Sequence, residues 1–170
     1  TVYIDTSVGG GLFDEEFQLW TELFFKEVME GKYKLAVSDI LFRELQNAPT
    51  HVGNYLDDLT PESIVAIQLN QEAQQLADMY LEEKIVGFKS LIDCQHIATA
   101  TVHNVEVLVS WSFKHIVNLD KIRLYNSVNL REGYRTIEIR TPREILHHGE
   151  SSILMTQCVL ISKLIPTLKP

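Results

Sequence analysis

Short apolar runs alternate along the chain with longer segments in which apolar residues recur every three or four positions. Continuous β-branched runs are typical of parallel strands covered on both faces, whereas the longer spacing is typical of amphipathic helices. Strands are therefore predicted at 2–4, 33–37, 105–110 and 136–139. Helices are predicted at 14–30, 38–47, 51–59, 70–83, 92–103 and 113–118, with a last helix opened by Pro142. This alternation predicts an α/β domain with a mostly parallel sheet.

The segments between these elements predict a turn, a loop and the boundary of the domain. Residues 9–11 are all glycine and predict a turn after the first strand, and the polar stretch between 118 and 136 predicts a loop. Residues 1–149 are predicted to form one domain. The final segment, 150–170, is mostly apolar and too short to span a membrane as a helix. It could pack on the core, bind a partner or have no role.

Composition supports a single globular domain. The chain has 170 residues, of which 45% are hydrophobic and 22% are charged. The net charge of −8 argues against a protein that wraps duplex DNA through a general basic surface, but it does not exclude a nuclease. Two widely separated cysteines without CxxC spacing indicate a reducing compartment. With no signal peptide and no long apolar stretch, we expect a soluble cytoplasmic protein without a membrane role.

Charge is unevenly distributed along the chain. Residues 1–111 contain 6 Lys and Arg against 18 Asp and Glu, whereas residues 112–149 contain 7 against 4. This second segment could form a phosphate-facing patch or simply a solvated surface. The cations concerned are Lys114, Lys121, Arg123, Arg131, Arg135, Arg140 and Arg143.

Three acidic residues lie where strands end or helices begin. Asp5 follows the first strand, Glu44 lies on the helix after the second strand, and Asp93 begins the helix before the strand predicted at 105–110. Ligands of open parallel sheets bind outside the carboxyl ends of the strands, which makes these acids candidates for a site. Converging carboxylates repel one another unless a cation compensates them, and Mg²⁺ or Mn²⁺ prefers such oxygen ligands. An ion of this kind activates water and neutralises charge on a phosphate.

Each acid also has an ordinary structural explanation. Asp5 could form an Asx turn, Asp93 could favour a helix N-terminus through the helix dipole, and Glu44 could be a surface carboxylate. The combination of a strand-end Asp, a helical Glu and a helix-opening Asp before an apolar strand favours the functional interpretation.

Four segments carry a family resemblance. They are Tyr3-Ile4-Asp5-Thr6-Ser7, Val37-Ser38 leading to Glu44-Leu45, Asp93-Cys94-Gln95-His96-Ile97-Ala98-Thr99-Ala100, and Val107-Leu108-Val109-Ser110-Trp111-Ser112-Phe113-Lys114-His115. Together they resemble the PIN-domain family, and most closely its bacterial VapC-like ribonuclease toxins and their uncharacterised relatives, over about residues 2–146.

The resemblance implies a PIN-like three-layer α/β/α fold and a metal-dependent endoribonuclease in which Asp5, Glu44 and Asp93 hold Mg²⁺ or Mn²⁺. The reaction it implies is hydrolysis of phosphodiester bonds in single-stranded or structured RNA, which leaves a 3′-hydroxyl and a 5′-phosphate. In toxin members a cognate antitoxin occupies the acidic cleft, and homodimers are usual.

The sequence departs from the family pattern at its fourth acidic position. Where many PIN domains carry further acids, this chain has Ser112 and His115. Ser112 is expected to orient water or a substrate phosphate as a catalytic residue, and His115 to contact phosphate or assist proton transfer. Thr6 and Ser7 would orient carboxylates or metal-bound water, and Lys114 would hold the RNA backbone. With three carboxylates we expect one metal ion, and an alternative remains open: a PIN-fold RNA- or protein-binding module with little or no turnover.

Three other signals are weaker. The glycine run does not meet the GxGxxG pattern of dinucleotide-binding loops, because Asp14 stands where the last glycine would be. An aspartyl-phosphatase motif would need an acid at Ser7. His96 and His103 lie two helical turns apart, too far for one zinc ion, and are expected to be core or surface residues.

Overall fold

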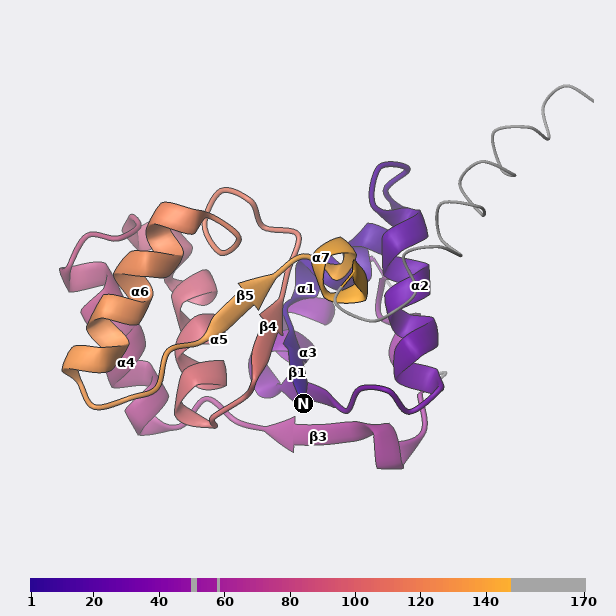
Figure 1. Ribbon diagram of the computed structural model, residues 1–170, viewed down its shortest axis with the longest axis horizontal. Helices are drawn as coiled ribbons and strands as arrows, with labels where there is room; N and C mark the ends of the chain where they lie inside the picture. The colour runs from indigo at the N-terminus through magenta and orange to yellow at the C-terminus, as the bar shows by residue number, and fades with distance from the viewer. Residues whose placement is uncertain (50–51, 58, 148–170) are drawn as a thin grey trace, which may run out of the picture.

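A parallel β-sheet forms the centre of the molecule (Figure 1). The computed structural model describes residues 1–49, 52–57 and 59–147. Within these ranges the sheet has five strands in the order β3-β2-β1-β4-β5, and every neighbouring pair is parallel. The strands are β1 (Val2–Ile4), β2 (Leu35–Ser38), β3 (Ile64–Ile67), β4 (Val107–Val109) and β5 (Glu138–Arg140).

Helices cover both faces of this sheet (Figure 1). One face packs against α4 (Gln71–Glu82), α5 (Leu91–Val102) and α6 (Leu119–Arg131). The other face packs against α1 (Thr6–Gly10), α2 (Gln18–Met29), α3 (Asp39–Leu45) and α7 (Pro142–His147). Short 3-10 turns are η1 (Gly11–Phe13), η3 (Asn54–Leu56), η4 (Pro61–Ser63) and η5 (Phe88–Ser90). The predicted three-layer α/β/α architecture is confirmed.

The alternation of side chains along β1 shows why the core has two parts. Val2 and Ile4 are buried on the side of α2, whereas Tyr3 is buried on the side of α5. Successive residues of a strand point to opposite faces, so a strand that is apolar throughout must be covered on both.

The strand order reverses its direction between β1 and β4. From β1 the chain moves to β2 and then to β3 at the sheet edge, after which it crosses to β4 on the other side of β1. Side chains that follow β1 and β4 therefore lie at a topological switch point, where ligands of parallel sheets bind.

The predicted loop between 118 and 136 is wrong, because most of it forms α6. Asn118 begins this helix by accepting a hydrogen bond from the backbone N–H of Lys121 at 3.2 Å. The buried face consists of Tyr125, Val128 and the polar Asn129, whose amide accepts a hydrogen bond from the buried Tyr80 hydroxyl. A buried asparagine on this face weakens the apolar periodicity from which the helix could have been predicted.

Several other boundaries also differ from the prediction. The glycine run belongs to α1 and η1 rather than to a turn, and α2 begins at Gln18, so that the acidic residues 14–16 precede it. The predicted helix at 113–118 is a set of turns, in which Ile116 and Val117 both donate to the carbonyl of Ser112. The predicted helix at 51–59 lies partly outside the described residues, which show η3 there, and segment 150–170 lies wholly outside them.

No helix in the described part of the chain is long and apolar enough to cross a membrane.

Cys94 gives a first test of this packing. Its side chain is fully buried on α5, and burial raises the pKa of the thiol to about 12. Because the thiolate is the reactive form, we expect Cys94 to resist a disulfide reagent at pH 8 in the folded protein and to react in guanidinium chloride. A Cys158→Ser variant isolates this thiol. Fast labelling of the folded variant would contradict the packing of α5 described here.

Candidate active site

Asp5 lies at the switch point with both carboxylate oxygens held. It follows β1, is 5% exposed and accepts a hydrogen bond from the Ser7 hydroxyl at 2.6 Å. Its second oxygen accepts from the hydroxyl of Ser110, which follows β4, at 2.8 Å. Burial raises the pKa of Asp5, and the nearby charge of Asp93 adds to this, while His96 and the two serines act in the opposite direction. Asp5 is therefore a buried acid whose negative charge is only partly compensated.

The same two serines attach the segment after β4 to Asp5. The Ser7 hydroxyl oxygen accepts from the backbone N–H of Trp111 at 2.8 Å, and that of Ser110 accepts from the backbone N–H of Ser112 at 2.9 Å. The backbone that carries Ser112 is thus positioned by the residues that position Asp5. The half-buried Ser112 lies at the same edge of the sheet.

Glu44 is held by side chains from two other elements. Its carboxylate accepts from the hydroxyl of Thr6 at the start of α1 and lies 2.9 Å from Nε2 of His96 on α5. Burial alone would raise the pKa of Glu44, but the hydrogen bonds from His96 and Thr6 outweigh it and the pKa is lowered. Glu44 therefore stays ionised at neutral pH.

His96 connects Glu44 to the core. It is 2% exposed, and its Nδ1 lies 2.5 Å from the hydroxyl of Tyr3, which in turn lies 2.7 Å from the hydroxyl of Ser38. Of the core and surface roles that the sequence left open for His96, the structure shows the core role, but the role of His96 in orienting Glu44 was not foreseen. Its position one turn after Asp93 on α5 places both side chains on one helix face, which was the available signal.

Asp93 lies in the first turn of α5 and is half-buried. Burial raises its pKa, and Glu44 contributes in the same direction, whereas His115, His96 and a hydrogen bond from Ser90 lower it. Asp93 is thus close enough to interact electrostatically with both Glu44 and Asp5. The structure brings the three predicted acids to one edge of the sheet.

Of the predicted phosphate-binding residues, His115 is near enough to Asp93 to lower the pKa of that carboxyl. His115 is half-buried, with its Nδ1 3.4 Å from the ammonium group of Lys121, which also donates to the carbonyl of Lys114 at 2.6 Å. The Lys114 side chain is exposed.

The remaining predicted cations are mostly engaged elsewhere. Arg123, Arg131 and Arg140 each form an ion pair with a nearby carboxylate, and the Arg143 guanidinium lies 5.1 Å from the centre of the Trp20 ring. Lys121 is the predicted cation whose charged group adjoins His115.

The donor chemistry of the acids fits Mg²⁺ or Mn²⁺. In the described ranges, no group of three or more His, Cys, Asp or Glu side chains is placed to hold a metal ion. Mg²⁺, however, is commonly held by one or two carboxylates, with water and substrate phosphate filling the other positions. Asp5 and Asp93 supply carboxylate oxygens of this type, and the charge of Asp93 acts on Asp5.

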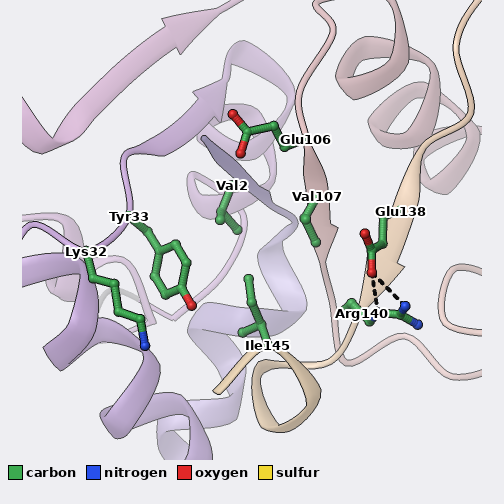
Figure 2. Close-up of a pocket in the computed structure, with 8 residues that line it drawn as sticks. All are labelled: Val2, Lys32, Tyr33, Glu106, Val107, Glu138, Arg140 and Ile145. Carbon is green, nitrogen blue, oxygen red and sulfur yellow. Dashed lines mark hydrogen bonds and ion pairs between the residues drawn. The ribbon is translucent and has the colours of Figure 1, made fainter. Parts of the chain in front are cut away.

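A separate hollow of about 380 Å³ lies at the opposite, amino-terminal edge of the sheet (Figure 2). Its apolar floor is formed by Val2, Val107 and Ile145. Its two cations are already paired, Lys32 with Glu27 at 2.9 Å and Arg140 with Glu138 at 2.6 Å. The hollow does not coincide with the acidic site.

Comparison with known proteins adds no assignment: no protein-family model matches the sequence, and neither does any of the curated proteins.

Proposed function

We propose that this chain is a metal-dependent endoribonuclease of the PIN-domain type, which hydrolyses phosphodiester bonds of single-stranded or structured RNA. The observation that carries the proposal is the meeting of buried Asp5 and half-buried Asp93 at the carboxyl edge of the parallel sheet, where burial, and to a smaller extent the charge of Asp93, raises the pKa of Asp5. Carboxylates crowded in this way are stabilised by a divalent cation. The resemblance to PIN domains supplies RNA as the substrate class.

The roles of the acids follow from their contacts. A bound Mg²⁺ or Mn²⁺ would lower the pKa of water and neutralise the charge that develops on the phosphate. Asp5 and Asp93 would hold it, Asp5 in the orientation that Ser7 and Ser110 impose. Glu44, kept ionised by Thr6 and His96, would complete the site by holding the ion directly or through water.

Other residues would act on the RNA. Lys114 and His115 would contact the phosphate backbone, and Ser112 would orient water or phosphate beside Asp5. Thr6 and Ser7 donate hydrogen bonds to carboxylates, which supports a role in orienting them rather than in binding substrate directly. A cognate antitoxin and a homodimer belong to the proposal through the resemblance alone, and a cytoplasmic location belongs to it through the cysteine usage.

Cleavage of a mixed-sequence single-stranded RNA with Mn²⁺, Mg²⁺ or EDTA tests the proposal. We expect cleavage with either ion, none in EDTA, and a loss of at least about 100-fold in an Asp93→Asn variant, because a bound metal contributes several kcal/mol to such reactions. Cleavage that persists in EDTA or in the variant would refute the assignment.

A second candidate function is RNA or protein binding without turnover. It is favoured by Ser112 and His115, which stand where many PIN domains carry further acids. It is also favoured because, among the described side chains, no group of three or more His, Cys, Asp or Glu is placed to hold a metal ion. Retained RNA binding together with no cleavage under any of the three conditions would support this candidate instead.

A further inference from the structure

A cluster of aromatic rings adjoins the acidic site. Trp111 is buried and stacks on Phe17, with ring centres 4.4 Å apart and planes 20° apart. Phe113 lies 5.9 Å from Phe17 and 6.0 Å from Trp111, and it is 49% exposed. About half of the Phe113 side chain therefore remains available to a ligand.

The backbone at Phe113 is fixed by the same groups that fix Asp5. Trp111 donates its backbone N–H to Ser7 and its indole N–H to Thr21, the latter at 3.0 Å. The N–H of Phe113 donates to the carbonyl of Trp111 at 3.0 Å, and the turn continues through two hydrogen bonds to the carbonyl of Ser112. Phe113 is thus presented on a hydrogen-bonded turn, and such preorganisation reduces the entropy cost of binding.

Positive charge follows Phe113 directly in the chain. Lys114 is exposed, and the ammonium group of Lys121 is bonded to its carbonyl and lies beside His115. An exposed aromatic ring beside cations is the arrangement by which proteins bind single-stranded nucleic acid, since bases stack on the ring while cations contact the phosphates.

We propose that Phe113, backed by Phe17 and Trp111, is a stacking platform for one unpaired base of single-stranded RNA, which places a neighbouring phosphodiester at Asp5 and Asp93. This inference rests on the proposed function and narrows it, because a base within a duplex is not free to stack on a side chain.

The test measures binding, so that it does not depend on cleavage. The probe is a single-stranded RNA that contains 2-aminopurine, whose fluorescence falls when the base stacks, and the buffer contains EDTA. We expect the wild-type protein to bind and quench the probe, and Phe113→Leu to weaken binding by at least about fivefold with loss of quenching. Phe113→Trp should retain both properties.

Phe42 provides a matched control. It is a phenylalanine of similar exposure, 47%, on α3. It lies two residues from Glu44, and residues two apart on a helix point to nearly opposite sides. We expect Phe42→Leu to bind the probe like the wild type. An equal loss in both variants would overturn the proposal.

Two further measurements keep the proposal open to refutation if Phe113→Leu folds poorly. With the wild-type protein, a probe with a single abasic nucleotide at the stacking position should bind at least about fivefold more weakly, and a fully paired RNA should compete poorly. Equal affinity for intact and abasic probes, or no binding of the probe, would overturn the platform.

Failure of the platform is distinguishable from failure of the nuclease. Metal-dependent cleavage with unchanged binding and KM in Phe113→Leu would refute the platform alone. Quenching that depends on Phe113 without any cleavage would support the platform and refute the nuclease.

Discussion

An Asp5→Asn variant is expected to lose RNA cleavage by at least about 100-fold and yet to be at least as stable as the wild type. Cleavage falls because a neutral amide is a poor metal ligand. Stability is kept because burial raises the pKa of Asp5, so its ionised form at pH 7 costs free energy in the folded state. An asparagine could still accept from Ser7 and donate to the oxygen of Ser110.

The pH dependence of this stability effect has a definite sign. A carboxyl group whose pKa is higher in the folded than in the unfolded state favours folding more as the pH falls. Thermal unfolding in EDTA should therefore give the variant an equal or higher Tm at pH 7, and the difference should narrow as the wild-type Asp5 becomes protonated at lower pH. A Tm several degrees below the wild type at pH 7 would mean that the fold needs this charge.

A Gly11→Ala variant is expected to be destabilised by about 1–3 kcal/mol, because it overpacks the site. A Cβ at Gly11 would lie 2.6 Å from the indole nitrogen of Trp111 and 2.7 Å from the hydroxyl of Thr21. These two groups are hydrogen-bonded to each other, and Trp111 also stacks on Phe17, so neither can move freely. The glycine is required for close packing, not for a loop that binds a dinucleotide.

Gly10→Ala is the matched control for this experiment. A Cβ at Gly10 would meet no atom within 4 Å, and the residue has helical dihedral angles. Because alanine favours a helix over glycine by about 1 kcal/mol, we expect this neighbouring substitution to be neutral or stabilising. Chemical denaturation of both variants gives the comparison. Similar unfolding free energies for the two variants would show that the Trp111 ring leaves room for a Cβ at residue 11.

The parts of the fold that the sequence predicts well are those with local signals. The apolar run that contains β4 and the polar residue after β1 are visible within a few positions, and both are where they were expected. Helix α6 was missed because Asn129 occupies its buried face while Leu119, Leu124 and Leu130 are half or more exposed. Tertiary contacts, not periodicity, determine that helix.

The residues of the candidate site likewise fall into those that a local sequence signal identifies and those that it does not. Asp5, Glu44 and Asp93 could be selected because each stands at the end of a strand or on an adjoining helix. Thr6 and Ser7, which also orient these acids, could be selected because they follow Asp5 directly in the chain. Ser110 and His96 could not, because the bond from Ser110 to Asp5 joins residues 105 apart and that from His96 to Glu44 joins residues 52 apart. Such pairings depend on strand order, which local patterns do not reveal.

The central position of β1 also has a consequence for how the chain folds. Its first residues pair on one side with Leu35 of β2, but on the other side with Val107 of β4. A chain emerging from the ribosome cannot complete the middle of its sheet until β4 has been synthesised. Pairings of such high sequence separation slow folding, since the loop must close before the contact forms. We therefore expect the half-made chain to expose an unpaired strand edge, which makes this stage of synthesis the one most exposed to aggregation.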